Sequence, residues 1–165
     1  MDDRITGFAP VVGDEPRILI LGSMPSVKSL EDTQYYAHTR NAFWKIQAAL
    51  FSEEYAENYE ERISRLKKHG IALWDSVHSC VRPGSLDSAI TDVIPNDIPR
   101  LLRENPSIQH IFFNGRASET IFRKHHKQLK DFPSSLLPST SPAAAMYTFE
   151  QKLEQWRCIL EYLQI

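Results

Sequence analysis

A short segment rich in aromatic rings is the part of this sequence whose residue types most directly suggest chemistry. It runs from Gln34 to Trp44 and combines three kinds of group: aromatic rings, a cation at Arg40 and an amide at Asn41. Aromatic rings beside polar groups are what proteins use to bind nucleobases turned out of the nucleic-acid stack. The alternative is a loop whose rings seal the core, which we favour for Trp44.

Several kinds of catalytic machinery are absent. Gly22 has no partner glycines that would make a phosphate-binding loop, and no His-x-Glu with Cys-x-x-Cys is present for a zinc-dependent base deaminase. No Gly-x-Ser-x-Gly turn frames Ser139 or Ser141 as a nucleophile. Asp75 lies at the end of an apolar run and can act as a base, although an aspartate that caps or braces a loop is commoner. The remaining candidates are amides and aromatic rings.

The elements that must position these groups are four apolar runs, each closed by a polar loop. Continuous apolar strands that alternate with helices predict a parallel sheet covered on both faces, that is, a three-layer α/β/α sandwich with a short central sheet. Sites in such sheets form beyond the carboxyl ends of the strands, so we expect the four loops to meet at one cleft. The predicted strands are 17–22, 71–77, 108–113 and 135–137, and the predicted helices are 41–51, 97–104 (capped by Asn96), 117–126 and 149–163.

Length and composition indicate one domain. The chain has 165 residues, 42% of them hydrophobic, which we divide into a polar leader, 1–16, and a core, 17–165. No apolar run is long enough to span a membrane and no secretory signal is evident. Cys80 and Cys158 lie far apart and form no metal-ligand spacing, which indicates a reduced cytoplasmic or nuclear protein with no bound metal.

The net charge of -2 is not typical of a general nucleic-acid binder. Any contact with nucleic acid must therefore come from a local patch. Two charged clusters are evident, and the alternative for both is a solvated helix face. The basic cluster comprises Arg116, Arg123, Lys124, His125, His126, Lys127 and Lys130, and the acidic cluster comprises Glu53, Glu54, Glu57, Glu60 and Glu61.

Four motifs, taken in order, resemble those of the hypoxanthine-DNA glycosylase family of the uracil-DNA glycosylase superfamily. They are residues 21–26, 34–44, 113–115 and 137–143. The resemblance covers the chain from about Arg17 to its C-terminus. It implies a glycosylase that removes hypoxanthine from DNA without metal or cofactor. The implied partner is double-stranded DNA with a deaminated base, bound by a monomer.

The resemblance also implies roles for individual residues. The loop that contains Ser23 and Met24 matches the water-activating loop of the superfamily, but a thioether can neither accept a proton nor orient a water. That duty is implied for Asn41 instead. Phe43 matches the ring that stacks on the flipped base, and Asn114 matches the asparagine that reads the base edge.

The fourth motif departs from the family's better-known relatives. Ser139 stands where the uracil enzymes carry a histidine, which predicts weak or absent uracil excision, and the neighbouring Ser141 belongs to the same loop. Met146 or Tyr147 falls where the superfamily inserts an apolar wedge into the duplex. The alternative is a small-residue lead into the last helix.

Several further residues flank the expected cleft. Lys28, Arg40 and Arg116 are candidate phosphate contacts. His38 and His78 lie nearby, although a lone histidine in a loop is more often a structural hydrogen-bonding group. Residues 84–88 also resemble a family loop, for which we expect a place at the rim of the cleft.

The chemistry of the glycosidic bond agrees with this set of residues. The bond breaks through a sugar cation and a departing base anion, so the site must place a water and bind the developing charge. An asparagine offers a donor beside an acceptor, which pairs with O6 and N1–H of hypoxanthine and rejects adenine. Uracil shows the same pattern at O4 and N3–H. A glycosylase with a different or broader range, and a superfamily member that binds without catalysis, therefore remain alternatives.

Overall fold

A four-stranded parallel sheet lies at the centre of the computed structural model, which describes residues 3–163. Its strands are β2 (Ile18–Gly22), β3 (Ile71–Asp75), β6 (His110–Asn114) and β7 (Ser134–Leu137), in the order β3-β2-β6-β7. Each neighbouring pair is parallel and in continuous register. All four carboxyl ends therefore reach the same edge of the sheet.

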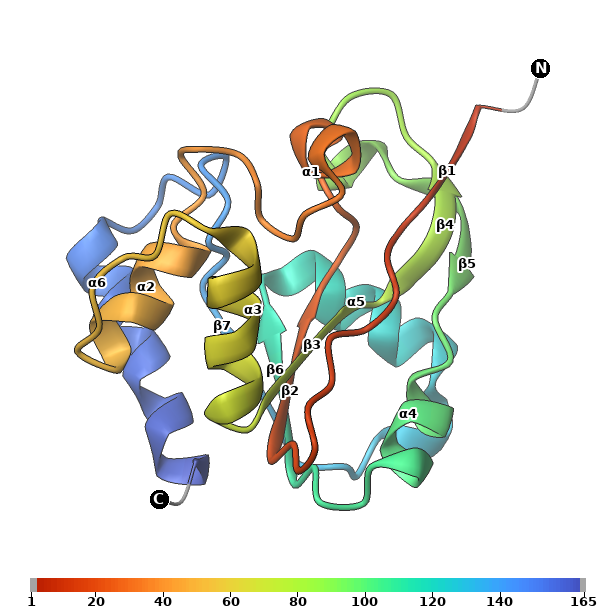
Figure 1. Cartoon of the computed structure of the whole chain (residues 1–165). Helices are drawn as coiled ribbons and strands as arrows, with labels where there is room; N and C mark the ends of the chain where they lie inside the picture. The colour runs from red at the N-terminus through yellow and green to blue at the C-terminus, as the bar shows by residue number, and fades with distance from the viewer. Residues whose placement is uncertain (1–2, 164–165) are drawn as a thin grey trace.

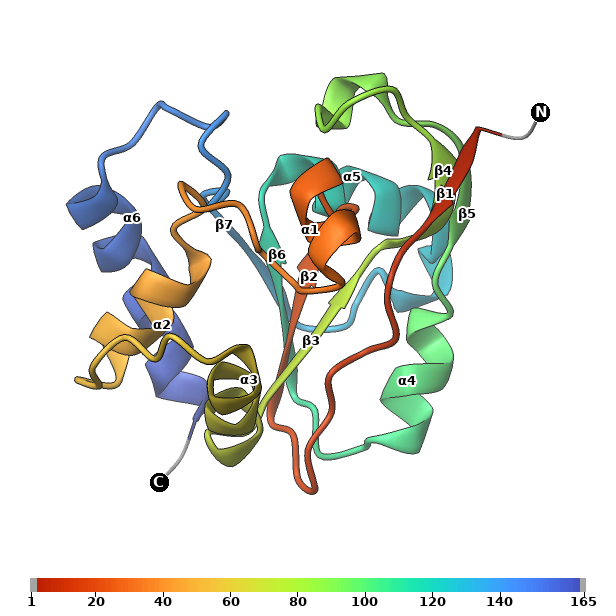
Figure 2. The same cartoon turned by 45° about the horizontal axis from the view of Figure 1, so that its top comes forward.

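Helices cover both faces of this sheet, as Figures 1 and 2 show. On β2, Ile18 and Ile20 pack against one side and Leu19 and Leu21 against the other, because successive side chains of a strand alternate. The first face is covered by α2 (Phe43–Leu50), α3 (Tyr59–Lys68) and α6 (Phe149–Trp156), and the second by α4 (Ile98–Glu104) and α5 (Arg116–His125). The predicted three-layer α/β/α arrangement is confirmed.

A second sheet was not predicted. It is antiparallel and comprises β1 (Arg4–Thr6), β4 (Val77–Val81) and β5 (Thr91–Pro95), in the order β1-β4-β5. The segment interpreted as a leader outside the core is thus part of the fold. Beyond β1, Val11 pairs with Leu73 of the parallel sheet.

The bounds of several elements differ from those predicted. The run 71–77 divides at Ser76, where the chain passes from the parallel to the antiparallel sheet. Asn96 does not cap α4: its Nδ2 donates to the carbonyl oxygens of Asp75 and Val77, while Asp97 caps the helix. The last predicted helix ends as the 3-10 helix η3 (Arg157–Tyr162). Three short elements had no prediction: α1 (Val27–Asp32) and the 3-10 helices η1 (Asp87–Ala89) and η2 (Lys127–Leu129).

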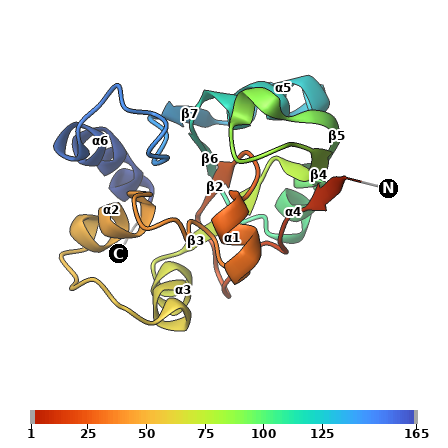
Figure 3. The ribbon, with the colours of Figure 1, turned by 90° about the horizontal axis from the view of Figure 1, so that it is seen from above.

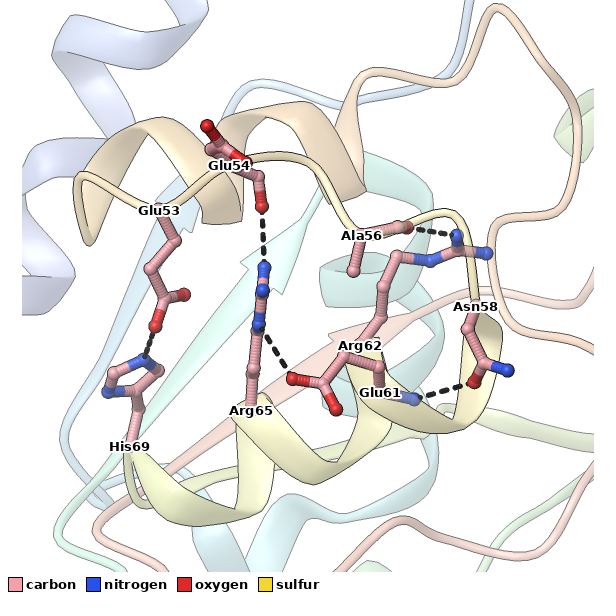
Figure 4. Close-up of polar contacts among 8 residues, drawn as sticks. All are labelled: Glu53, Glu54, Ala56, Asn58, Glu61, Arg62, Arg65 and His69. Atoms are coloured by element: carbon pink, nitrogen blue, oxygen red, sulfur yellow. Dashed lines mark hydrogen bonds and ion pairs between the residues drawn. The ribbon is translucent and has the colours of Figure 1, made fainter.

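The acidic cluster folds back on α3 and the segment before it (Figure 4). Glu53 contacts His69 at 3.1 Å and Glu61 pairs with Arg65 at 3.3 Å. Arg65 also donates to the carbonyl oxygen of Glu54, and Arg62 donates to that of Ala56. The carboxylates of Glu53 and Glu61 are therefore engaged within α3 and the loop before it.

Candidate active site

The loops that follow the four parallel strands enclose a pocket of about 300 Å³. Figure 3 shows this end of the molecule from above. The pocket lining comes from residues 22–26, 35, 36, 38, 41, 75, 85–87, 114 and 139–143, with Ser29 of α1. The predicted convergence of the strand-end loops is therefore confirmed, and the loop predicted for the rim contributes Ser85, Leu86 and Asp87.

Asn114 ends β6 and presents an amide whose orientation is fixed. The backbone N–H of Thr140 donates to Asn114 Oδ1 at 2.9 Å, and Asn114 Nδ2 donates to Thr140 Oγ1 at 3.0 Å. Because a backbone N–H can only donate, it identifies which end of the amide is the oxygen. Both side chains are more than nine-tenths buried. Thr140 leaves one N–H and one lone pair of Asn114 unused, and the Tyr36 hydroxyl lies beside this amide.

Of the two stacked rings Tyr36 and Phe43, Tyr36 lines the pocket and Phe43 does not. Phe43 is fully buried in the core, and its ring stacks on Tyr36 with centroids 4.2 Å apart and planes inclined by 22°. The prediction that Phe43 contacts a flipped base is therefore wrong. Phe43, Ile46, Gln47 and Leu50 are all buried on one stripe of α2, at the spacing of a core-facing helix surface. Phe43 supports Tyr36 from behind.

The loop around Tyr36 is held on both sides. Tyr35 donates its hydroxyl to Ala9 O and its backbone N–H to Tyr59 Oη, and its carbonyl accepts from Trp44 Nε1. On the other side, Ala37 N–H donates to Ser29 Oγ. Tyr36 itself has a φ of 54°, a left-handed conformation uncommon for a residue with a side chain. The surrounding contacts impose this conformation, and strained residues of this kind concentrate at functional sites.

Asn41 lies half-buried at the pocket just before α2. Its Oδ1 accepts a hydrogen bond from Phe43 N–H at 2.9 Å, which fixes the side chain against the start of the helix. The amino group and the second lone pair of the amide remain for a water molecule or a substrate. Asn41 can orient a water in this way but cannot take its proton.

Gly22 ends β2 at a position where the side chains of Asp75 and Tyr36 occupy the volume that a Cβ would fill. A Cβ on Gly22 would lie 2.5 Å from Asp75 Oδ1 and 2.9 Å from Tyr36 Oη. Asp75 ends β3, beside Gly22 in the sheet register. The absence of a side chain at Gly22 therefore lets a carboxyl group and a phenol approach each other at the strand ends.

Asp75 is the most strongly perturbed acid of the pocket. It is 4% exposed, and its Oδ2 has no hydrogen-bond partner among residues 3–163. Burial and then the Asp87 carboxylate raise the pKa of Asp75 to about 7, while the Arg82 guanidinium opposes this shift. Burial and then the Asp75 charge also raise the pKa of Tyr36, whereas the neighbouring side chain of Asn114 opposes this shift.

The remaining pocket residues predicted from the second and fourth motifs are mainly structural. Ser23 donates its hydroxyl to Asp87 Oδ1 at 2.6 Å, which ties the β2 loop to the rim. Met24 packs against Val77 and Cys80 under the antiparallel sheet. In the fourth loop, Ser139 Oγ accepts from Ser141 N–H, and Ser141 Oγ accepts from Ala143 N–H. All four residues line the pocket.

Comparison with known proteins places this chain in a family. Residues 9–164 match the family model of the uracil DNA glycosylase superfamily. Hypoxanthine DNA glycosylase of Methanosarcina acetivorans is 32% identical over 160 residues, which are 94% of this chain and 98% of that protein. The chain belongs to the uracil DNA glycosylase superfamily.

Two further relatives agree with this membership. Hypoxanthine DNA glycosylase of Methanosarcina barkeri is 36% identical over 113 residues, 68% of this chain and 72% of that protein. A Methanosarcina acetivorans protein provisionally named a uracil DNA glycosylase has a solution NMR structure that matches this fold with a TM-score of 0.84 and 31% identity, over 97% of this chain and 98% of the other. The superfamily fold is thus shared over nearly the whole chain.

The five residues predicted to contact phosphates or to act as a wedge all lie outside the pocket. Arg40 and Arg116 are exposed, and Lys28 pairs with Asp32 at 3.3 Å on α1. Met146 is 82% exposed and Tyr147 is 38% exposed on the loop that leaves the fourth motif. These positions are compatible with the phosphate and wedge roles, which stay predictions.

The basic cluster of α5 is only partly available to a ligand. Arg123 pairs with Glu119 at 3.3 Å, and its guanidinium lies over the Phe113 ring. His126 is buried and contacts the carbonyl oxygen of Asn96. The ion pair lies within α5, whereas the other two contacts hold the helix and its C-terminal end to the fold, so Arg123 and His126 are already engaged within the protein.

The structure distinguishes His38 from His78, two histidines that the sequence placed equally near the cleft. His38 lines the pocket, and its Nδ1 accepts from the backbone N–H of Arg40, so a neutral His38 ring carries its proton on Nε2. His78 is exposed on β4 and does not line the pocket.

Within residues 3–163, no three His, Cys, Asp or Glu side chains cluster closely enough to hold a metal ion. In the same range, no helix is long and apolar enough to cross a membrane.

Sequence reasoning missed or undervalued three residues at this site: Tyr36, Thr140 and Asp75. The helical spacing of apolar residues in α2 indicated that Phe43 belongs to the core. The ring that lines the pocket must then come from before α2, which leaves Tyr36 as the candidate. For Thr140, a pattern of serine, threonine and proline indicates a loop but not which hydroxyl points inward. The importance of Asp75 follows from its burial. This burial depends on segments distant in the chain, so no local sequence pattern predicts it.

Proposed function

We propose that this protein is a monofunctional DNA glycosylase that hydrolyses the N-glycosidic bond of deoxyinosine and releases hypoxanthine for base excision repair. The observation that carries the proposal is the clamped amide of Asn114 beside the Tyr36 ring in one pocket. The names of the two Methanosarcina relatives support the choice of hypoxanthine. The proposed substrate is a deaminated base in double-stranded DNA, and the proposed enzyme acts as a monomer.

The geometry suggests how the reaction proceeds. The extruded base stacks on the face of Tyr36 away from Phe43, and the free N–H and lone pair of Asn114 bind O6 and N1–H. Because Thr140 fixes the amide, adenine would face Asn114 donor to donor and acceptor to acceptor. Asn41 orients the water that adds to the sugar carbon as the bond to the base breaks. No cofactor enters this scheme.

Contacts with the duplex complete the proposal. Met146, with Tyr147 beside it, fills the gap that the extruded base leaves, because exposed apolar side chains serve as wedges between base pairs. Arg40, Arg116 and Lys28 bind phosphates, which position the duplex without reading its sequence.

A buried amine bears on whether the enzyme also cuts the DNA strand. Lys152 is 6% exposed, and burial lowers its pKa. Its Nζ donates to Ser141 O at 3.3 Å, and Lys152 does not line the pocket. The amine therefore supports the fourth loop instead of reaching the sugar, so the proposed product is an abasic site in an uncut strand.

One assay tests this proposal. Duplexes that carry deoxyinosine, deoxyuridine or only normal bases are incubated with the protein, and abasic sites are then cleaved with alkali. We expect alkali-dependent cleavage at deoxyinosine, little at deoxyuridine, and none in the normal duplex. Equal excision of uracil would instead favour a broader deaminated-base glycosylase. Binding without cleavage of either lesion would favour a non-catalytic member of the superfamily.

A further inference from the structure

A buried acid, one oxygen of which has no hydrogen-bond partner within residues 3–163, lies in the row of groups along the carboxyl edge of the parallel sheet. Asp75 ends β3, Gly22 ends β2 and Asn114 ends β6, and these three strands are neighbours. Tyr36 Oη lies above Gly22, close to Asp75. The amide proposed to read the base and the Asp75 carboxyl group are therefore separated only by a strand whose last residue has no side chain.

The backbone around Asp75 is held in place. Asn96 Nδ2 donates to Asp75 O at 2.8 Å, and the next residue, Ser76, donates its N–H to Gly22 O at 2.8 Å. Asp75 lines the pocket, yet its Oδ2 has no partner within the described chain. Buried polar atoms of this kind are rare unless a ligand or water completes them.

The charge state of Asp75 affects the reaction because negative charge develops on the base as the glycosidic bond breaks. When the glycosidic bond breaks, its electron pair moves onto the purine, and a carboxylate nearby would oppose this negative charge. A neutral carboxyl group would instead donate to it. Asn114 supplies only amide hydrogens, and the fourth loop has Ser139 and no histidine at the corresponding place. Asp75 lines the same pocket, and its carboxyl group can supply a proton to the leaving purine.

We propose that Asp75, in its protonated form, is a catalytic general acid that delivers its proton to N7 of the departing hypoxanthine. This inference rests on the proposed function and adds a second contact to the purine. N7 is adjacent to O6, the atom that Asn114 binds, so the two strands that flank β2 would each supply one contact to this edge of the base. A pyrimidine has no counterpart of N7, which gives the site a chemical means to favour hypoxanthine over uracil.

The step balances without a further reactant. The C1′–N9 bond breaks, its electron pair passes into the purine ring, and the proton of Asp75 moves to N7, so that neutral hypoxanthine leaves. The water held by Asn41 forms a bond to C1′ and loses its proton to solvent. Asp75, now a carboxylate, takes a proton from solvent before the next turnover.

The surroundings of Asp75 favour the protonated form. The charged and titratable groups that face it are Asp87, Arg82, Tyr36 and Tyr35. Burial and Asp87 outweigh Arg82 and hold the pKa of Asp75 near 7. A bound base excludes more water and disfavours the carboxylate further. We therefore expect the acid to stay protonated at neutral pH in the complex and to ionise above it.

The first test is the pH dependence of single-turnover hypoxanthine release. For the wild-type protein we expect a rate that falls above an apparent pKa of 7 or higher, approaching tenfold per pH unit. Asp75→Asn should remove this dependence and slow release at pH 7 on the order of a hundredfold or more, the usual contribution of a general acid. Asp87→Asn is the matched control: loss of its charge should move the fall in rate to lower pH and preserve its shape.

A binding experiment tests the contact with N7 separately from the rate. Duplexes contain 2′-fluoroarabino-inosine, whose fluorine destabilises the sugar cation and slows cleavage, or the 7-deaza form of the same nucleoside. The wild-type protein should bind the first duplex more tightly at pH 6 than at pH 8, where N1–H of inosine is still intact. This dependence should disappear with the 7-deaza duplex and in Asp75→Asn. Thermal unfolding checks that the variant folds, and we expect it to be more stable than wild type at pH 8, since no buried carboxylate remains.

Four results would overturn the inference. A wild-type rate that rises with pH through 7 would make Asp75 a base instead of an acid. Equal rates for wild type and Asp75→Asn would remove Asp75 from the chemistry, and pH-dependent binding that survives in the 7-deaza duplex would remove N7. If the wild-type protein releases no hypoxanthine at any pH, the proposed function fails as well, and the inference with it.

Discussion

Replacement of Thr140 by valine tests whether the orientation of Asn114 is set by its neighbour. The change removes the Oγ1 that accepts from Asn114 Nδ2 at 3.0 Å and retains the shape of the side chain. Thr140 is 1% exposed and Asn114 is 8% exposed, so water cannot easily replace the lost partner. A buried donor left unpaired costs about 1–3 kcal/mol. We expect the free energy of unfolding to fall by about 1–2 kcal/mol on this basis.

The effect on catalysis should be smaller than that of losing Asn114 itself. The Thr140 backbone N–H still donates to Asn114 Oδ1 in the variant, so the amide keeps its orientation and adenine should still be rejected. What is lost is rigidity of the N–H that faces the base. A loss of about 1.4 kcal/mol in transition-state stabilisation corresponds to a rate about tenfold slower.

Single-turnover release of hypoxanthine and urea denaturation, measured on the same preparations, provide the assay. Thr91→Val is the matched control, because Thr91 Oγ1 donates to Val81 O on an exposed strand outside the pocket. That variant should retain the wild-type rate and unfold within about 0.5 kcal/mol of it. If Thr140→Val lost stability but released hypoxanthine at the wild-type rate, the hydroxyl would hold the loop and have no part in presenting Asn114.

Other perturbations have equally definite outcomes. Asn41→Ala should slow single-turnover release on the order of a hundredfold with little change in binding to an inosine duplex; an unchanged rate would remove the water-positioning role. It should also cost about 1 kcal/mol of stability, because Oδ1 no longer holds the start of α2. Gly22→Ala should lower both stability and rate, because its Cβ would displace Asp75 and Tyr36, and a variant with wild-type values would show that this space is not needed. Borohydride should trap no covalent complex with DNA, whereas trapping that Lys152→Ala abolishes would make the enzyme a lyase. Excision should persist unchanged in EDTA, and activity that zinc or magnesium restores after chelation would contradict the water-based mechanism.

Local patterns in the sequence were sufficient to predict the central sheet. The runs that became β2 and β6 contain the unbroken apolar stretches 18–21 and 111–113, which are typical of strands buried on both faces. Helical periodicity placed α2 and α5 within about two residues of their observed bounds. The rule that parallel strands end at a common edge then brought Asn114 and the fourth loop together. These inferences succeeded because each depends on neighbours along the chain or on a general property of parallel sheets.

Only the tertiary structure decided the chemistry inside the pocket. Tyr36 and Phe43 are both aromatic, and which one faces the pocket depends on the left-handed turn at Tyr36 and on the side of α2 that meets the sheet. The short strand β1 could not be predicted because three residues carry little periodicity, and it is its pairing with β4 that defines it. Asp75 has an ordinary sequence context. Its raised pKa comes from burial beneath segments distant in the chain and from the charges of Asp87 and Arg82, and such long-range desolvation is a property of the folded molecule.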